Sequence, residues 1–288
     1  MLTPENVVFL EIGFFAVVFL YLFGLVYAAW KRRQKLSASY LPKLNEVLVD
    51  YLKDFQYFRT LTIEGQVEFV KRLRYLVKSK SFIGMDGLAV TRNMRIKLSA
   101  TIVQLTYGLK SYDIPAYDEI MVYPDTFFHP ILKVKMKGFT SVRGNLAVSW
   151  PDYQKGYDVP DDNYNLGLHE LAHALHINTA KTHGNQHFKR HFKYWTEKSL
   201  TDFYDLKNNK NQFLREYGGT NFHEFFAVVI EHLFESPARF LEEIPHLYIR
   251  TCELLNQNPL NSKKDYAFDW SDFLQYLGKN QTTNQRPQ

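Results

Sequence analysis

The sequence predicts an α+β domain that follows one long hydrophobic segment near the N-terminus. Residues 7–30 are almost wholly apolar, whereas most later segments repeat their apolar residues with the period of a helix. Between residues 119 and 150, short runs rich in β-branched and aromatic residues indicate the strands of a small sheet. The predicted organisation is a hydrophobic segment with a basic flank at 1–35, one folded domain at 36–277 and a disordered tail at 278–288.

The composition is that of a globular protein. The chain has 288 residues, 45% of them hydrophobic, which is enough to bury the core of one large domain or two small ones. Its single cysteine, Cys252, excludes an internal disulfide and a structural zinc site built from cysteines. The formal net charge is +5, but no basic stripe is interleaved with aromatic residues, so the sequence argues against a nucleic-acid-binding protein.

The hydrophobic segment at residues 7–30 is long enough to cross a bilayer, because a helical span needs ~20 residues for ~30 Å of hydrocarbon. A basic cluster follows at residues 31–35, and positive charge usually stays on the cytoplasmic side. We therefore expect a single-pass membrane protein, in a bacterial inner membrane, whose folded domain is cytoplasmic. The alternative is a cleaved signal peptide, but it would carry its positive charge before the apolar run.

The elements of the domain follow from the spacing of apolar residues and from turn signals. The expected helices before the sheet cover residues 44–52, 63–78 and 91–106. The expected strands cover 120–123, 131–136 and 145–150, with Pro124 and Gly144 marking turns between them. After a polar, turn-rich stretch at 151–165, we expect helices at 166–176, 221–236 and 237–254, and a last helix at 266–276.

The helix expected at 166–176 contains the pattern His-Glu-Leu-Ala-His at residues 169–173. On a helix, residues four apart lie nearly above one another, so His169 and His173 point their imidazoles at one place. Imidazole nitrogen is a good zinc ligand, and Glu170 stands where its carboxylate can reach a metal-bound water. The pattern is typical of zinc-dependent peptidases, in which the glutamate is the general base. The alternative is that both histidines are hydrogen-bonded core residues.

A third metal ligand is needed, because a catalytic zinc usually has three protein ligands. The extended pattern H-E-x-x-H-x-x-G-x-x-H requires a glycine at position 176 and a histidine at position 179, but the chain has His176 and Thr179. The third ligand should therefore come from another helix. Glu224 is the best candidate, three residues after the helix-capping Asn221. It is equally compatible with a capping-box carboxylate that serves only the end of its own helix.

Other side chains compete for roles around this pattern. Three further histidines follow at a spacing of four residues: His183, His187 and His191. They form either a second metal site or, as the neighbouring basic residues favour, one face of a polar helix. We expect His176 to pair with a carboxylate close to the metal. Glu231, two turns after Glu224, either orients a metal ligand or is solvated.

The histidine pattern is part of a wider one that covers roughly residues 81–240. Its parts are Val122–Pro124, Gly144–Asp152, Asn165–Leu175, and Tyr217 with Glu224–Val228. With these residues the chain resembles the zinc-dependent peptidases of the Mlc titration factor A family, which are related to the anthrax lethal factor catalytic domain. The resemblance implies a zincin-like α+β metallopeptidase domain. It also implies that Glu224 is the third metal ligand and that Tyr217 lies beside the metal-bound water and the substrate carbonyl.

One hypothesis for function combines these residues. Zn²⁺ held by His169, His173 and Glu224 activates a water, Glu170 accepts its proton, and a peptide or protein substrate is hydrolysed by endo- or aminopeptidase action. The strand at 146–150 is expected to border the cleft and to pair with an extended peptide. The alternative is a membrane-tethered zinc-binding module that regulates or binds another protein and has little catalytic activity. A regulatory protein partner is compatible with either function.

Overall fold

The structure, a computed structural model, describes residues 22–24, 27, 48–181, 186–274 and 276. The chain divides into two compact units, residues 1–50 and 51–288. Most of the predicted hydrophobic segment at 7–30 and the whole of the predicted tail at 278–288 lie outside the described residues. For these two ends the division into domains stays a prediction.

The expected membrane localisation is corrected by the helices that the structure describes. Within the described ranges, no helix is long and apolar enough to cross a membrane. The longest of them, α3 (Ile63–Ser79), has 17 residues and carries charged side chains such as Lys71 and Arg72. A span needs ~20 predominantly apolar residues. On this finding the expectation of a single pass through a bilayer at residues 7–30, with a cytoplasmic domain, is wrong.

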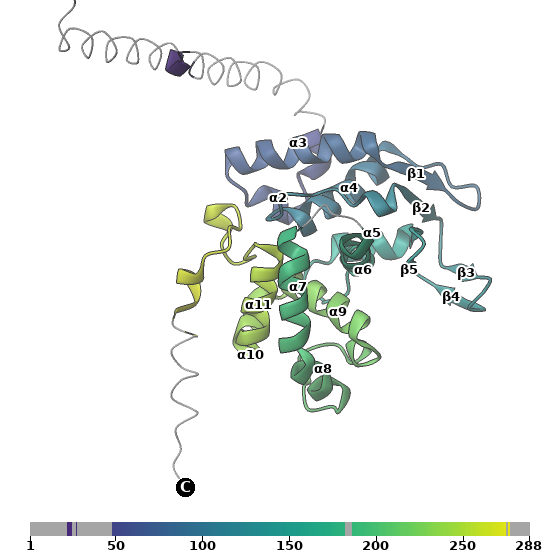
Figure 1. Cartoon of the computed structure of the whole chain (residues 1–288). Coiled ribbons are helices and arrows are strands. Elements are labelled where there is room, and N and C mark those ends of the chain that lie inside the picture. Colours follow the sequence, from purple (N-terminus) through teal and green to yellow (C-terminus); the bar gives the residue numbers. More distant parts are fainter. Residues whose placement is uncertain (1–21, 25–26, 28–47, 182–185, 275, 277–288) are drawn as a thin grey trace, which may run out of the picture. The chain divides into compact units, whose positions relative to one another are not determined.

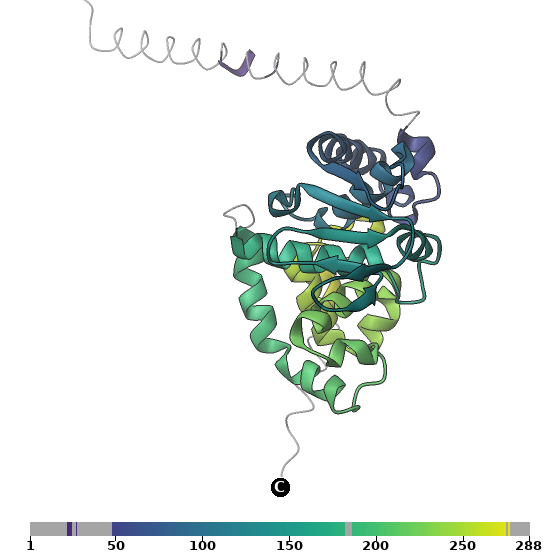
Figure 2. The ribbon, with the colours of Figure 1, turned by 90° about the vertical axis from the view of Figure 1, so that its right-hand side faces the viewer.

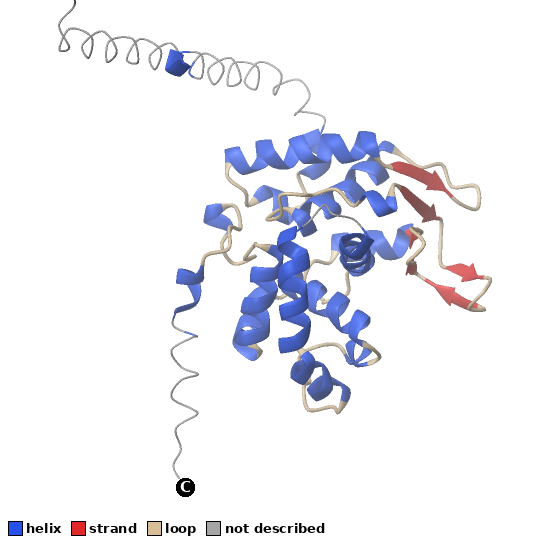
Figure 3. Ribbon diagram, viewed as in Figure 1, coloured by secondary structure: helices blue, strands red, loops and turns tan. Residues whose placement is uncertain are grey.

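The second unit is an α+β domain in which helices predominate and the strands gather at one side (Figure 3). Besides α3, its α-helices are α2 (Gln56–Arg59), α4 (Arg92–Thr106), α5 (Trp150–Asp158), α6 (Leu166–Lys181), α7 (Gln186–Lys198), α8 (Leu200–Lys207), α9 (Phe222–Glu235), α10 (Pro237–Glu243) and α11 (Pro245–Leu255). Short 3₁₀ turns occur at η1 (Pro115–Tyr117), η2 (Glu216–Gly219), η3 (Ser262–Lys264) and η4 (Trp270–Phe273).

The strands form a four-stranded sheet and a separate two-stranded hairpin. They are β1 (Ser81–Gly84), β2 (Glu119–Tyr123), β3 (Phe127–His129), β4 (Val134–Met136), β5 (Gly138–Thr140) and β6 (Leu146–Ser149). The order in the sheet is β1-β2-β6-β5, with β1, β2 and β6 parallel and β5 antiparallel to β6. β5 is therefore one edge of the sheet, and the β3–β4 hairpin directly precedes it in the chain (Figure 1).

Several elements differ from those that the local patterns predict. No strand is expected before residue 120, but β1 forms because Phe82 is buried and pairs with Ile120 of β2. Of the strand expected at 131–136 only β4 forms, since Lys133 adopts a left-handed conformation (φ 55°) at the hairpin turn. Residues 150–158 form α5, where Pro151 suits the first turn of a helix.

Helix α6 lies between the sheet and α9, as two perpendicular views show (Figures 1 and 2). Three leucines at helical spacing on α6, Leu168, Leu171 and Leu175, are buried. α9 is almost entirely buried and packs along α6. This packing fixes the rotation of α6 about its own axis, so the polar side chains of the two helices meet in a defined geometry.

Candidate metal centre

Two histidines extend from α6 toward α9. The side-chain oxygen of Asn165 accepts a hydrogen bond from the backbone N–H of Leu168 at 3.0 Å and so caps the start of α6. One turn later, the Nε2 atoms of His169 and His173 lie 3.3 Å apart. Their side chains are 12% and 13% exposed, so both rings are largely removed from water while their Nε2 atoms share one small space.

Glu224 enters this space from the first turn of α9. The side chain of Asn221 caps α9 by accepting hydrogen bonds from the backbone N–H groups of His223 and Glu224, at 3.0 and 3.1 Å. The carboxylate of Glu224 extends to the histidines instead of closing a capping box. Its Oε2 atom lies 3.0 Å from His169 Nε2 and 3.5 Å from His173 Nε2.

The three donor atoms fit one metal ion. Tetrahedral ligands at zinc distances of 2.0–2.1 Å stand about 3.3–3.4 Å from one another. The three donor-to-donor distances given above, 3.0, 3.3 and 3.5 Å, bracket that value. Among the described residues, His169, His173 and Glu224 are the one group of three potential ligands whose atoms all lie within 4.8 Å of one another.

A buried carboxylate on α9 orients His169. Glu231 Oε1 accepts a hydrogen bond from His169 Nδ1 at 2.7 Å, and the Glu231 side chain is only 2% exposed. The charge of Glu231 is balanced by an ion pair with Arg215, and its Oε2 atom accepts a hydrogen bond from the backbone N–H of Asn165 at 2.7 Å. A proton on Nδ1 leaves the Nε2 lone pair of His169 free for a metal.

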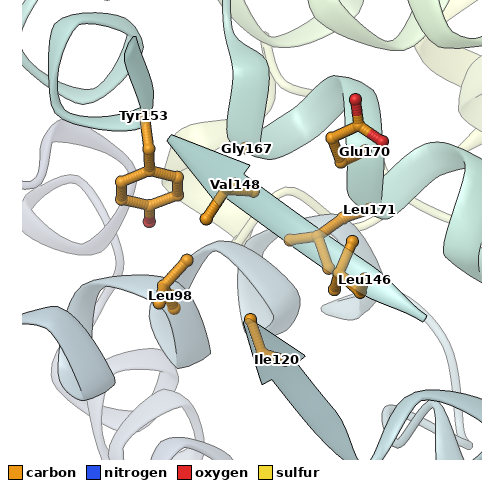
Figure 4. A pocket seen from close by; sticks show the side chains of 8 residues that line it. All are labelled: Leu98, Ile120, Leu146, Val148, Tyr153, Gly167, Glu170 and Leu171. Carbon is orange, nitrogen blue, oxygen red and sulfur yellow. The ribbon is translucent and has the colours of Figure 1, made fainter. Parts of the chain in front are cut away.

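Glu170 is buried beside this cluster and does not belong to it. Its carboxylate accepts a hydrogen bond from the Thr140 hydroxyl at 2.7 Å and lies directly against Gly138, where an added Cβ would stand 2.3 Å from an oxygen of Glu170. Figure 4 shows that carboxylate turned away from the apolar side chains, such as Leu98 and Ile120, that line a small neighbouring cavity. Burial raises the pKa of Glu170, an effect that His169, His173 and Thr140 partly offset.

The charges within the cluster favour a cation. Burial disfavours a protonated His169, but the hydrogen bonds with Glu224 and Glu231 outweigh it and raise the pKa of His169 to about 10. Burial also disfavours an ionised Glu224, yet His169 and His173 hold the pKa of that carboxyl well below its usual range. A metal cation that binds here would take the place of the proton that the imidazoles attract.

Tyr217 lies at the open side of the site. It belongs to the turn η2, its side chain is 53% exposed, and its ring centre is 6.0 Å from that of His169. Partial burial and the negative charges of Glu224 and Glu170 raise the pKa of Tyr217, so its hydroxyl stays protonated at neutral pH. It is therefore a hydrogen-bond donor next to the candidate metal ligands.

The other histidines lie apart from this cluster. His176 stacks on Phe192, with a ring-centre distance of 4.3 Å, instead of pairing with a carboxylate, and burial lowers its pKa to about 4. His187 Nε2 lies 2.9 Å from the backbone oxygen of Glu253, and His191 Nδ1 lies 2.8 Å from the backbone oxygen of His187. His183 is outside the described residues.

The strand predicted to border the site contacts α6, but the edge strand beside α6 is β5. The segment expected to border the cleft, at 146–150, is mainly β6, which is paired on one side with β2 and on the other with β5. A strand with two partners has no free edge for a peptide. β5 contacts α6 directly, through Gly138 and through Thr140, whose hydroxyl also bonds the backbone oxygen of Glu170.

Sequence reasoning assigned no role to three residues that support the site: Asn165, Thr140 and Arg215. Asn165 has a recognisable position, directly before a helix, where such a residue is a common cap. By contrast, no local pattern singles out Thr140 or Arg215, because each reaches the site only through the packing of β5 and η2 against α6 and α9.

Comparison with known proteins places the sequence in a family. The sequence model of the family described as glucose-regulated metallo-peptidase M90 matches residues 27–254. A protein of Synechocystis sp., described as uncharacterised, is 25% identical over 244 residues, covering 76% of this chain and 85% of the relative. Mlc titration factor A of Yersinia pestis is 22% identical over 267 residues, covering 86% of this chain and 94% of the relative.

Proposed function

The chain belongs to the glucose-regulated metallo-peptidase M90 family, and from that premise we propose that it is a zinc-dependent peptidase that hydrolyses peptide bonds. One observation carries the proposal: His169, His173 and Glu224 converge beside the buried carboxylate of Glu170. Structural zinc sites are usually closed by four protein ligands, whereas catalytic sites have three and one open position. A second carboxylate, one that is not a candidate ligand and whose pKa is raised, is what a general base for hydrolysis requires.

Zinc is the metal that suits this set of donors, since two imidazole nitrogens and one carboxylate oxygen are the ligands of many catalytic zinc sites. When bound, zinc would supply Lewis-acid activation of a water molecule and of the scissile carbonyl group. His169, His173 and Glu224 would hold it. Glu231 keeps the Nδ1 proton of His169 in place, so that the Nε2 lone pair would be available to the metal.

Glu170 moves the proton. Its carboxylate accepts a proton from the attacking water as the water oxygen bonds to the carbonyl carbon, and then delivers that proton to the leaving amine. The Thr140 hydroxyl fixes the carboxylate, and Gly138 leaves room for it. The Tyr217 hydroxyl donates to the carbonyl oxygen as negative charge develops on it.

An extended peptide is the substrate that suits the neighbouring sheet. β5 is an edge strand, and within the described part of the chain it pairs only with β6. A peptide that adds to the outer side of β5 through main-chain hydrogen bonds would pass Gly138 and Thr140, the two residues that contact Glu170. A peptide bound in this way would have its scissile bond beside Glu170. Because the pairing uses main-chain atoms, it would not require a particular substrate side chain.

Removal of the metal tests the proposal. We expect the full-length, zinc-loaded protein to cleave an unfolded protein or an aminoacyl chromogenic substrate. A zinc chelator should abolish that cleavage, and one equivalent of zinc should restore it. Elemental analysis before and after each step gives the occupancy. Cleavage that continues at the same rate in protein free of metal would contradict the proposal.

A second function is favoured by the name of the Yersinia relatives, Mlc titration factor A. A protein with that name acts by binding, and this chain would then be a zinc-binding module that sequesters a regulatory protein and has little catalytic activity. The two functions differ in one measurement. Protein with full zinc occupancy that cleaves no substrate, but forms a stoichiometric complex with a repressor of the Mlc type, would favour binding over catalysis.

A further inference from the structure

The β3–β4 hairpin presents a group of bulky apolar side chains to solvent. Ile131 is 79% exposed and Phe128 is 59% exposed, and Leu132 and Val134 are exposed as well. The hairpin lies at the side of the domain where the strands gather and extends away from the helices (Figures 1 and 3). Exposed apolar side chains that occur as a group usually mark a surface that binds another molecule.

The same hairpin is positively charged. Between residues 124 and 145, Asp125 is the one acidic residue, and the basic residues are Lys133, Lys135, Lys137 and Arg143. All of these basic side chains are exposed. Lysines on an edge strand discourage aggregation, but that role does not require apolar side chains beside them. A partner that suits this surface therefore combines apolar groups with acidic ones.

An apolar and a charged side chain are neighbours on one face of the hairpin. Phe128 of β3 lies opposite Lys135 of β4, and both side chains are exposed. Successive residues of a strand point to opposite faces, and residues paired across two strands share a face. An extended segment that carries both apolar and acidic residues can therefore contact Phe128 and Lys135 at once.

The hairpin leads directly to the strand beside the candidate metal centre. Lys137 is the one residue between β4 and β5. The ring of His129 on β3 packs against that of Phe139 on β5, with centres 4.4 Å apart, and this contact holds the hairpin against β5. Gly138, next to Phe139, lies directly against the carboxylate of Glu170. A peptide that pairs with β5 would therefore meet the hairpin on one side of its scissile bond.

We propose that the β3–β4 hairpin is a docking surface for the protein substrate, and that it selects extended segments in which apolar residues alternate with Asp or Glu. The apolar side chains of such a segment would cover Phe128, Ile131 and Leu132, and its carboxylates would pair with Lys133 and Lys135. The identity of this partner as the substrate rests on the proposed peptidase function, whereas binding of the segment can be measured without hydrolysis.

The position of the charges favours a peptide chain over other partners. A second copy of this protein would bring the same positive charges together, which is unfavourable. A bilayer would contact the tip of the hairpin at residues 130–133, but Lys135 and Lys137 lie further along the chain toward β5. A peptide that follows this strand meets the tip, these lysines and β5 in turn. Since a strand rises ~3.3 Å per residue, about seven residues of peptide extend along residues 134–140.

Binding is tested with a labelled peptide and protein that cannot cleave it. The probe is a fluorescein-labelled peptide of about ten residues, long enough to extend along the hairpin and β5, in which Leu and Glu alternate. Fluorescence anisotropy with full-length, zinc-loaded Glu170→Gln protein should show saturable binding. Peptides with Lys in place of each Glu, or Ser in place of each Leu, should bind about tenfold more weakly or worse. Added salt should weaken binding of the Leu–Glu peptide, because salt screens exposed charges.

Variants of the hairpin, made in the same protein, locate the surface. The double variant Ile131→Ser, Leu132→Ser should weaken binding of the Leu–Glu peptide about tenfold, and Lys135→Glu should weaken it about fivefold. The matched controls are Leu200→Ser on α8 and Lys189→Glu on α7, both at exposed positions, and they should leave binding unchanged. All of these variants should keep the thermal unfolding midpoint of the parent protein, because each changes exposed side chains only.

Hydrolysis gives a second measurement, in protein that retains Glu170. The hairpin variants should raise KM for the Leu–Glu peptide. They should leave kcat/KM for an aminoacyl chromogenic substrate unchanged, because so short a substrate does not extend to the hairpin. A protein that binds the Leu–Glu peptide through the hairpin but hydrolyses neither substrate would overturn the peptidase function and leave the docking surface intact.

Other results would overturn the docking surface and leave the peptidase function intact. One is equal affinity for the Leu–Glu peptide in the parent protein and the hairpin variants. Another is equal affinity for the Leu–Glu and Leu–Lys peptides. A dimer in sedimentation that the double variant dissociates, without peptide binding, would assign the hairpin to a second copy. Binding to phosphatidylglycerol vesicles that the double variant loses, again without peptide binding, would assign it to lipid.

Discussion

Helices α6 and α7 both carry histidines four residues apart, but they use them differently. On α6, His169 and His173 meet the carboxylate of Glu224, so that three donor atoms from two helices share one space. On α7, the rings of His187 and His191 stack with centres 4.0 Å apart and bond to backbone oxygens of Glu253 and His187. The spacing alone produces a pair of neighbouring rings in both helices.

The difference arises from what packs against each pair. α9 brings Glu224 to the α6 pair as a third donor, and it brings the buried Glu231 to hold the outer nitrogen of His169. α11 offers the α7 pair a backbone oxygen and a carboxylate of Glu253 that stays 3.9 Å from His191. A candidate metal centre therefore requires a partner helix of the right composition as well as the histidine spacing.

The largest expected effect is the loss of the metal from α6 alone. We expect His169→Ala to lose stoichiometric zinc and all peptidase activity, because two remaining donors bind zinc far more weakly than three. His187→Ala is the matched control and should retain both. Elemental analysis of the purified variants measures the zinc content. Equal zinc content in the two variants would show that the histidines of α6 are not the ones that bind the metal.

Substitution of the base should separate catalysis from metal binding. Glu170→Gln keeps the size of the side chain and the three candidate ligands, but it cannot accept a proton. We expect kcat to fall about 10²–10⁴-fold, the usual contribution of a general base. Zinc content and the thermal unfolding midpoint should stay close to those of the wild type. A variant with full activity would remove Glu170 from the mechanism.

A smaller effect is expected from the carboxylate that orients His169. Glu231→Gln weakens the hydrogen bond to His169 Nδ1 and leaves Arg215 without its ion-pair partner. Loss of such a supporting group typically lowers metal affinity or activity about 10–100-fold. Glu253→Gln, on the side of α7, should leave zinc affinity unchanged. The two dissociation constants can be compared by competition with a chromophoric chelator, and identical values would count against a supporting role for Glu231.

The smallest expected effect is a shift in pH dependence. The hydrogen bond from Thr140 favours ionised Glu170 and so lowers the pKa of that carboxyl, against the larger effect of burial. Thr140→Val removes the bond and should raise the pKa of Glu170. Because the base must be ionised, the acid limb of the kcat/KM profile should move to higher pH, with a few-fold loss below its midpoint and little change above. A profile that moves to lower pH would refute this role.

Those parts of the site that depend on neighbouring residues in the sequence can be predicted from it. The helix around His169 and the capped start of α9 can both be predicted, because periodicity and capping residues act within a few positions. The role of Glu231 remained undecided, since a carboxylate two turns along α9 is compatible with solvent until the packing of the helices is known. β5 was missed because Gly138–Thr140 is a strand only through its pairing with β6.

The contacts that assemble the site join segments that are far apart in the sequence. The contact between Thr140 and Glu170 and the one between Glu231 and Asn165 join segments that no local pattern relates. The same holds for a cavity that is lined by Glu235, by residues of α2 and by residues of the segment 259–266. Such contacts depend on the whole fold, and single-sequence patterns do not contain them.

Anomalous diffraction at the zinc edge, from crystals of the zinc-loaded protein, locates the bound metal and identifies its ligands. We expect one strong peak between His169 Nε2, His173 Nε2 and Glu224 Oε2, with the carboxylate of Glu170 close by but not bonded to the metal. A peak between His187 and His191, or zinc bonded directly to Glu170 in place of Glu224, would contradict it.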